Sequence, residues 1–240
     1  MNRRHLLGVL ALTSTTWLGT LPSPALAQGQ EISFGIISTE STANLKSTWQ
    51  PVLDDMHKAT GLTVKAFFAP DYAGVIEGMR FNKVQVAWMG NKSGMEAVDR
   101  AGAEVFARMQ QPDGGVGYWS LMVVHKESPL RSLDDVLKSR AGLTLGFGDP
   151  NSTSGALIPG YYAFTKNNVD PVKDFKRTVR ANHETNILAI VNKQIDVSTV
   201  ASDAVERMKI KMPEKAAELR EIWRSPMIAS DPMLWRKDLD

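Results

Sequence analysis

Short apolar runs alternate with amphipathic stretches along most of the chain. Residues 32–37, 62–68 and 84–89 have the length and apolar character of buried strands. The stretch between the first two runs places its apolar residues at helical spacing, and we expect that helix to end at Gly61. The residues that form its apolar face are Leu45, Trp49, Val52, Leu53 and Met56.

The same alternation continues to the end of the chain. Further helices are predicted over residues 72–80, 93–101, 184–192 and 203–211, and further strands over 120–125, 143–147, 175–179, 196–199 and 220–224. Ser132 and Asp135 form a capping-box pattern, which predicts another helix start. Strands that alternate with helices through short polar turns indicate an α/β fold around a parallel sheet.

Glycine and proline gather in residues 110–117, where the chain is expected to leave one lobe for another. We therefore predict two α/β lobes with a first crossing at residues 117–125 and a second at residues 224–232. The first lobe would comprise residues 28–120 together with 225–240, and the second lobe residues 121–224. No internal repeat or low-complexity tract interrupts this organisation.

The first 27 residues have the pattern of an export signal. Arg3 and Arg4 precede an apolar run over residues 6–21, and Ala25 and Ala27 form an A-x-A cleavage site. The run is short for a membrane-spanning helix. We predict cleavage after Ala27 and a periplasmic location, by either the general secretion route or the twin-arginine route.

Charge and cysteine content exclude several classes of protein. The leader holds two arginines and no acid, so its removal leaves 26 basic and 26 acidic residues. A chain without net charge lacks the basic footprint of a nucleic-acid-binding protein. With no cysteine there is no disulfide, thiol nucleophile or thiolate metal site. The histidines have no metal-ligand spacing, and no cofactor is expected.

Ligands of open α/β sheets bind beyond the carboxyl ends of strands, so the segments directly after predicted strands are candidates for a site. They are residues 38–41, 69–72, 148–155 and 183–185. The third is the most informative, because Ser152, Thr153 and Ser154 stand between a strand and a helix-like segment. Hydroxyls and free N–H groups at a helix start can bind an oxyanion. The same pattern also fits a plain helix N-cap at Ser152 or Ser154, and Pro159 predicts a late start or a break in the helix.

Strings along nearly the whole mature chain closely resemble the phosphonate-binding proteins of ABC importers, especially those for 2-aminoethylphosphonate. The matching strings lie at residues 34–41, 67–74, 78–83, 95–100, 117–120, 148–155, 159–162, 175–179, 183–186 and 231–232. The resemblance implies a two-lobed periplasmic binding protein type II fold, with a hinge of two crossing strands and the ligand cleft between the lobes.

The resemblance also implies a site with two poles. Ser152, Thr153 and Ser154 would hold the phosphonate oxygens through hydroxyls and backbone N–H groups, and His183 would join them as a charged or neutral donor. His183 also fits a helix N-cap or a structural histidine. The ammonium would lie against the remaining ligand-binding residues, Tyr72, Tyr118, Asp203 and Asp231.

Two differences from the close relatives bear on the ammonium pole. Those relatives carry a glutamate at the position of Asp203 and asparagines at the positions of Val200 and Ala201. The carboxylate is thus retained with a reach about 1.5 Å shorter. Either tyrosine also fits ordinary packing, and Asp231 before Pro232 is a common turn pair.

The function implied is capture of a phosphonate, expected to be 2-aminoethylphosphonate, and its delivery to the membrane permease and ATPase of an importer, without catalysis. One alternative is the same fold tuned to phosphite, phosphate or another small oxyanion. A distant alternative is a serine-type phosphoester hydrolase that uses Ser152, His183 and Asp231. Family members continue beyond the equivalent of Asp240 with helices that complete the first lobe and, in some, pair two protomers, so a homodimer is expected where those helices are present.

Overall fold

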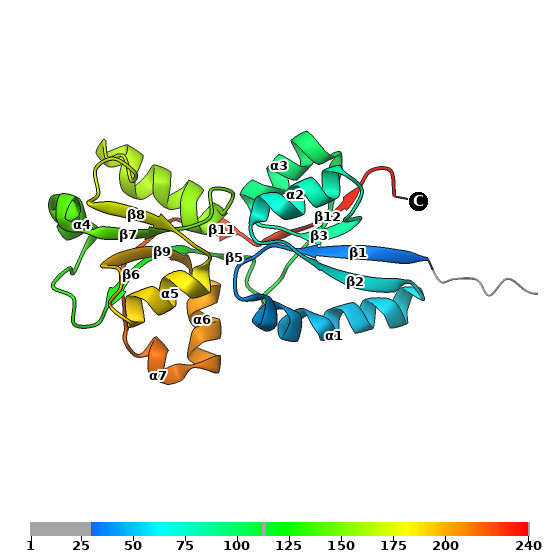
Figure 1. The fold of residues 1–240 in the computed structure, drawn as a ribbon, viewed down its shortest axis with the longest axis horizontal. Helices are drawn as coiled ribbons and strands as arrows, with labels where there is room; N and C mark the ends of the chain where they lie inside the picture. Colours follow the sequence, from blue (N-terminus) through cyan, green and yellow to red (C-terminus); the bar gives the residue numbers. More distant parts are fainter. Residues whose placement is uncertain (1–29, 112–113, 240) are drawn as a thin grey trace, which may run out of the picture.

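Two five-stranded sheets lie side by side, each covered by helices, in the computed structural model (Figure 1). The structure describes residues 30–111 and 114–239. We call the part built on the first sheet the first lobe and the part built on the second sheet the second lobe. Two short strands connect them, so the chain passes between the lobes twice.

The first lobe has the strand order β2-β1-β3-β12-β4. Its strands are β1 (Glu31–Ile36), β2 (Thr63–Phe68), β3 (Val86–Trp88), β4 (Ala103–Arg108) and β12 (Pro232–Arg236). Its helices are α1 (Thr42–Thr60), α2 (Tyr72–Arg80) and α3 (Asn91–Ala101). Strand β12 enters the lobe from the far end of the chain and joins β3 to β4.

Alternation along β1 explains how helices cover both faces of this sheet. Phe34 and Ile36 pack with Trp49 of α1 on one face, whereas Ile37, directly after the strand, packs with residues of α2 such as Ile76 on the other. Helix α1 ends at Gly61, as predicted, because that residue takes a left-handed conformation with φ of 73°.

The second lobe has the strand order β10-β6-β9-β7-β8. Its strands are β6 (Ser120–His125), β7 (Thr144–Phe147), β8 (Arg177–Arg180), β9 (Val197–Ala201) and β10 (Leu219–Arg224). Its helices are α4 (Leu133–Ser139), α5 (His183–Val191), α6 (Ser202–Lys211) and α7 (Pro213–Ala216). Two short 3₁₀ segments are η1 (Arg140–Gly142) and η4 (Thr165–Asn167), and two short π-helical segments are η2 (Thr153–Leu157) and η3 (Gly160–Phe164).

Both faces of the second sheet are also buried. Ile187 of α5 and Val205 of α6 lie in one apolar cluster with Val123 of β6. Phe147 and Phe164 belong to the cluster on the other side, where their rings meet edge to face at 5.8 Å between centroids. The predicted capping box is present at the start of α4, between Ser132 and Asp135.

The hinge consists of β5 (Gly117–Tyr118) and β11 (Ile228–Ala229), which pair with each other in antiparallel fashion. They form a separate two-stranded sheet between the lobes (Figure 1). A side chain at Gly117 would place its Cβ 2.5 Å from the carbonyl oxygen of Ile228. The two crossing backbones can therefore approach this closely only with glycine at this position.

The expectation of a parallel sheet is wrong for part of each lobe. Parallel pairing is confined to β1, β2 and β3 in one sheet and to β7, β8 and β9 in the other. Strands β12 and β6 run antiparallel to their neighbours, because each carries a crossing chain from one lobe into the other. Strand β4 and helix α7 were not predicted, and β4 is largely exposed, so it lacks the apolar run used to find strands.

Within the described residues, no helix combines the length and the apolar character that crossing a membrane requires. The predicted leader, residues 1–27 with its cleavage site after Ala27, lies outside the residues that the structure describes.

Candidate ligand site between the lobes

The eight residues predicted to bind ligand all line one narrow cavity of about 30 Å³. They come from six places in the sequence: Tyr72; Tyr118; Ser152, Thr153 and Ser154; His183; Asp203; and Asp231. Most follow the carboxyl end of a strand, where ligands of α/β sheets bind. The structure thus places them together, and their role in binding stays a prediction.

Ser152 is the N-cap of η2, which begins the segment after β7. Its Oγ accepts a hydrogen bond of 2.9 Å from the backbone N–H of Gly155. The N-cap interpretation therefore describes the oxygen of this hydroxyl correctly. Because a hydroxyl has one hydrogen to donate as well, Ser152 can cap the turn and still donate to an anion in the cavity.

Two glycines allow the η2 loop to fold back on itself. The N–H of Gly148 donates to the carbonyl oxygen of Gly155 at 2.8 Å. A Cβ on Gly148 would lie 2.5 Å from the Cα of Gly155, and a Cβ on Gly155 would lie 3.1 Å from Cε1 of His183. Glycine at both positions therefore lets the loop lie close to the β7 end and to His183.

Thr153 and Ser154 are also fixed by hydrogen bonds. Thr153 Oγ1 accepts from the backbone N–H of Lys92 at 2.9 Å, across the cleft. The carbonyl oxygen of Ser154 accepts from Ser120 Oγ at 2.6 Å. Both residues are buried. This part of the cavity is thus a rigid turn of hydroxyls and amides rather than a mobile loop.

His183 is buried and neutral. Its Nδ1 accepts a hydrogen bond of 3.3 Å from the N–H of Ala201, so the ring proton lies on Nε2. Nε2 is 3.5 Å from Ser152 Oγ. Burial, helped by the positive charge of Arg207, lowers the pKa of His183 from 6.5 to about 3. Of the charged and neutral donors considered from the sequence, the structure favours the neutral one, and the N-cap of α5 is Asn182 rather than His183.

These contacts contradict the serine-hydrolase arrangement. In a triad the acid orients the histidine through Nδ1. Here Nδ1 of His183 accepts from a backbone N–H, and Asp231 accepts instead from the hydroxyl of Tyr118. Among the residues that the structure describes, the histidine therefore has no acid partner that would let it act as a general base for Ser152.

Tyr118 and Asp231 form the centre of the opposite pole. The Tyr118 hydroxyl, on the hinge strand β5, donates to Asp231 Oδ1 at 2.8 Å. Burial, against the lowering effect of the Tyr118 hydrogen bond, raises the pKa of Asp231 from 3.8 to about 7, with smaller opposing effects from the charges of Asp203 and Arg207. Burial and the neighbouring Asp231 also raise the pKa of Tyr118. A buried carboxyl of this kind gains a partner when a cation enters.

Tyr72 begins α2 and is buried in the same cavity. Its N–H donates to Asp149 Oδ2 of the second lobe at 3.3 Å. Burial and the charge of Asp231 raise the pKa of the Tyr72 hydroxyl, while a hydrogen bond with Ser152 lowers it. The Tyr72 ring therefore lies between the two poles, with its hydroxyl neutral.

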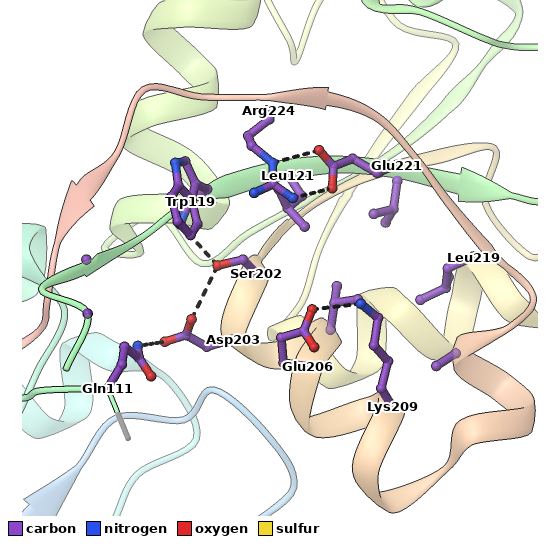
Figure 2. A pocket seen from close by; sticks show the side chains of 15 residues that line it. Gln111, Trp119, Leu121, Ser202, Asp203, Glu206, Lys209, Leu219, Glu221 and Arg224 are labelled. Atoms are coloured by element: carbon purple, nitrogen blue, oxygen red, sulfur yellow. Dashed lines mark hydrogen bonds and ion pairs between the residues drawn. The ribbon is translucent and has the colours of Figure 1, made fainter. Parts of the chain in front are cut away.

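Asp203 lies at the edge of the cavity, near the start of α6. Its Oδ2 accepts from Gln111 Nε2 at 3.0 Å and its Oδ1 from Ser202 Oγ at 3.2 Å, as Figure 2 shows. Behind it is a groove of about 570 Å³, whose walls pair their own charges, for example Arg224 with Glu221. Both carboxylates are half-buried, and Asp203 accepts two side-chain hydrogen bonds where Asp231 accepts one. Val200 and Ala201 stand before Asp203, at the two positions where asparagines are expected in the close relatives. Ala201 lines the cavity, and Val200 packs in the core.

Sequence reasoning missed Trp88 and Arg207, which line the cavity. Thr39 lines it too and lies in the predicted segment 38–41, as does Glu40, which lines the adjoining space. Arg207 of α6 forms an ion pair with Glu40 of the first lobe. Asp203 and Arg207 are four residues apart on one helix, so they share a face, and that spacing could have indicated the arginine. Trp88 gives no such signal, because a tryptophan at a strand end fits ordinary packing.

The two lobes touch on both sides of this cavity. Glu184 of α5 accepts hydrogen bonds from the N–H of Ser41 and the side chain of Asn44, at the start of α1. On the other side, Lys92 donates to the carbonyl oxygen of Pro150. The cavity is thus enclosed by contacts between residues of different lobes. Nowhere in residues 30–111 and 114–239 are three or more histidine or acidic side chains gathered as a metal site would require.

In a comparison with protein families, residues 34–240 match the family described as "ABC transporter, phosphonate, periplasmic substrate-binding protein". The match covers both lobes and the hinge.

Two curated relatives and one solved structure agree with this match. The chain is 58% identical over 232 residues to the phosphonates-binding periplasmic protein of Escherichia coli K12, covering 96% of this chain and 68% of that protein. It is 29% identical to the phosphate-import protein PhnD of Mycolicibacterium smegmatis, over 87% and 67% of the two chains. The crystal structure of a phosphonate transporter binding protein from Pseudomonas aeruginosa superposes with a TM-score of 0.87 at 57% identity, covering 88% of this chain and 70% of that one.

These relatives are binding components of importers rather than enzymes, and their fold is that of periplasmic binding proteins. The resemblance inferred from the sequence, the two-lobed fold and the absence of an enzymatic role are thereby confirmed. This chain belongs to the periplasmic substrate-binding proteins of phosphonate ABC transporters, and it is the component that binds the phosphonate.

Proposed function

We propose that the ligand is 2-aminoethylphosphonate, held with its two charged ends at opposite poles of the narrow cavity. The phosphonate lies against the η2 turn, where Ser152, Thr153, Ser154 and the Nε2–H of His183 act as donors. The ammonium lies against Asp231 and Tyr118, with Asp203 nearby. The observation that carries this proposal is the Tyr118–Asp231 pair, in which a half-buried carboxyl, forming no ion pair within the described residues, faces a turn of neutral donors.

The anion pole suits a phosphonate because its donors are already oriented. Ser152 is held by Gly155, Thr153 by Lys92 and His183 by Ala201. Preoriented hydroxyls and amides lose little freedom on binding, and hydrogen bonds to a charged oxygen are stronger than neutral ones.

The cation pole adds selectivity for an amine. A cation next to Asp231 favours the ionised carboxylate over the neutral acid, so ligand binding lowers a pKa that burial has raised. The faces of Tyr72 and Tyr118 offer further attraction to the ammonium. Methylphosphonate and phosphate would fill the anion pole only and would leave this acid unpaired.

Binding is coupled to closure of the lobes about β5 and β11. The contacts of Glu184 with Ser41 and Asn44, and of Arg207 with Glu40, join the lobes when the cleft is closed. Ligand contacts from both lobes favour that closed state over an open one. The closed form is then recognised by the membrane permease, which an ATPase drives.

Calorimetric titration tests the proposal. The purified protein is titrated with 2-aminoethylphosphonate, methylphosphonate and phosphate under the same conditions at pH 8. We expect 2-aminoethylphosphonate to bind tightest, by about 2 kcal/mol or more over methylphosphonate, because a buried ion pair forms only with the amine. Methylphosphonate binding as tightly would exclude a working cation pole.

The same titration decides the second candidate, a small inorganic oxyanion. The identity to the mycobacterial phosphate-import protein favours this candidate. Phosphate binding tighter than both phosphonates would support it and would contradict the proposal above.

Three finer predictions belong with this function. The leader is cleaved after Ala27, which intact-mass measurement of the exported protein tests. The lobes comprise residues 28–120 with 225–240 and residues 121–224, a division that the membership of strands in the two sheets supports. Forms that carry the C-terminal helices of the relatives pair as homodimers, which light scattering tests.

A further inference from the structure

A second chamber opens directly beside the proposed ligand cavity. It has a volume of about 260 Å³ and shares part of its lining with the narrow cavity. The chamber is the larger of the two spaces and has room for a substituent of several atoms. The shared lining residues are Thr39, Trp88, Tyr118, Asp203, Arg207 and Asp231.

Seven of the sixteen residues that line the chamber are apolar or aromatic. Leu45, Trp49 and Val52 line it from α1, and Met233 lines it from β12. The rings of Trp49 and Trp88 pack at 5.1 Å between centroids. A wall of this kind favours the carbon skeleton of an organic substituent over a hydrated ion.

Polar atoms without partners are concentrated in the same chamber. Among the described residues, four buried side-chain nitrogen or oxygen atoms have no hydrogen-bond partner, and three of them belong to lining residues of the chamber. These three are Thr39 Oγ1, Trp88 Nε1 and Ser230 Oγ. Thr39 is 5% exposed and Ser230 is 2% exposed. Buried polar groups in folded proteins are nearly always hydrogen-bonded, so three exceptions at one place point to a ligand group.

The chemistry of these three atoms limits what that group can be. Trp88 Nε1 can only donate, whereas the two hydroxyls can both donate and accept. A hydroxyl or carbonyl oxygen satisfies such a set. A carboxylate fits less well, because Asp203 and Asp231 also face the chamber and the positive charge of Arg207 is already paired with Glu40.

The position of the carboxylates fixes how a ligand would reach the chamber. Asp203, Asp231 and Tyr118 line both spaces, so an ammonium held by them lies at the passage between cavity and chamber. A substituent on that nitrogen then points away from the phosphonate and into the chamber. The nitrogen stays a cation when it carries an alkyl group, so its contact with the carboxylates is kept.

We infer that the site accepts N-substituted aminoalkylphosphonates, with the substituent in the chamber and its hydroxyl or carbonyl oxygen bound by Trp88, Ser230 and Thr39. This inference rests on the proposed function, since it uses the same two poles. The substrate class is therefore wider than 2-aminoethylphosphonate and selects for a polar group at the end of the substituent.

Two ligands of matched shape test the inference by calorimetry: N-(2-hydroxyethyl)-2-aminoethylphosphonate and N-propyl-2-aminoethylphosphonate. They differ only in a terminal hydroxyl against a methyl group. We expect the hydroxyethyl compound to bind about tenfold tighter than the propyl compound, the equivalent of one net hydrogen bond. We also expect its affinity to lie within about tenfold of that of 2-aminoethylphosphonate, because the chamber admits the substituent without strain.

A matched pair of variants tests whether the substituent binds in the chamber. Val52→Phe adds bulk at the chamber wall, and Val98→Phe makes the same change on α3, at a residue of similar exposure that lines neither space. In Val52→Phe, the affinity for the hydroxyethyl compound relative to 2-aminoethylphosphonate should fall at least tenfold. In Val98→Phe this ratio should equal that of the unmodified protein.

The outcomes distinguish failure of this inference from failure of the proposed function. Equal affinity for the hydroxyethyl and propyl compounds, or binding of both more than 100-fold weaker than 2-aminoethylphosphonate, would overturn the inference and leave the proposed function standing. A ratio that is the same in Val52→Phe and Val98→Phe would also overturn it. Failure of 2-aminoethylphosphonate to bind tighter than methylphosphonate would instead overturn the proposed function.

Discussion

The two poles of the cavity bind opposite charges by different means. The anion pole is one short stretch of chain, the η2 turn, joined only by His183, and all its donors are neutral. The cation pole is assembled from Tyr118 on the hinge, Asp231 beyond it and Asp203 on α6, and it holds two half-buried acid groups. One pole is thus a local structure, and the other exists only when the lobes and the hinge are in place.

This difference separates affinity from selectivity. Hydrogen bonds of the η2 turn are available to any tetrahedral oxyanion, so this pole contributes to the binding of every candidate ligand. The Tyr118–Asp231 pair contributes only when the ligand brings a cation. A family member can therefore change its ligand preference at the hinge end while it keeps the turn unchanged.

The largest expected effect comes from removing the charge of the cation pole. Asp231→Asn keeps the shape and the acceptor for Tyr118 but cannot ionise. We expect it to weaken binding of 2-aminoethylphosphonate by about 2–4 kcal/mol at pH 8, as for loss of one partner of a buried charge pair. Methylphosphonate, titrated in the same calorimeter, should bind with unchanged affinity. An equal loss of affinity for both ligands would contradict the division of the cavity into an anion pole and a cation pole.

Removing a donor of the anion pole should have a smaller effect that does not depend on the ligand's amine. Ser152→Ala is expected to weaken both phosphonates by roughly 1.5–3 kcal/mol, since a hydrogen bond to a charged group is lost. Because Ser152 also caps η2, the variant loses stability of the order of 1 kcal/mol as well.

Ser132→Ala is the matched control for that variant. Ser132 caps α4 through Asp135, and it lines neither the cavity nor the chamber. Its replacement should lower the thermal midpoint by a similar amount and leave both affinities unchanged. If Ser152→Ala and Ser132→Ala behaved alike in titrations, Ser152 would be a cap and nothing more.

The pH dependence sharpens the comparison, because only one pole titrates near neutrality. The pKa of Asp231 is raised to about 7, so this carboxyl is mostly neutral at pH 6 and mostly ionised at pH 8. Pairing with an ammonium requires the ionised form. The affinity for 2-aminoethylphosphonate relative to methylphosphonate should therefore rise by up to about tenfold from pH 6 to pH 8. The two phosphonate groups titrate with different pKa values, because the ammonium stabilises the dianion of one of them, so Asp231→Asn serves as the reference. The rise of the ratio from pH 6 to pH 8 should be larger in the unmodified protein than in Asp231→Asn.

The smallest effect is expected at His183. Its pKa is lowered to about 3, so it stays neutral and donates through Nε2 throughout the pH range above 4. His183→Gln places an amide donor near the same position and should cost less than about 1 kcal/mol for either ligand. Nitrogen NMR of the histidine ring at pH 6 should find the Nε2–H form. A protonated ring at that pH would mean that a charge, rather than a neutral donor, acts at the anion pole.

The same difference between the poles explains how far the sequence could be interpreted. The hydroxyl run between a strand and a helix-like segment is visible along the chain, so the η2 turn could be predicted from Ser152 to Gly155. The hydrogen bond of Ser152 to Gly155 is local for the same reason. The cation pole was predicted only by resemblance, because Tyr118 and Asp231 are 113 residues apart and no local pattern relates them.

Other features could not be predicted because they depend on tertiary contacts. Strand β12 completes the first sheet from the far end of the chain, which makes that sheet mixed rather than parallel. Trp88 and Ser230 each fit ordinary packing in the sequence, and only the fold brings them to one chamber. The sequence left open whether His183 is charged or neutral, because its protonation state depends on burial and on the hydrogen bond from the N–H of Ala201.

The orientation of bound 2-aminoethylphosphonate in a crystal structure of the complex tests the central claim most directly. We expect the phosphonate oxygens within hydrogen-bonding distance of the Ser152 and Thr153 hydroxyls, the η2 amides and His183 Nε2, and the ammonium nitrogen beside Asp231 and Tyr118. A ligand bound in the reverse orientation, or one that leaves the η2 donors facing only solvent, would contradict the account.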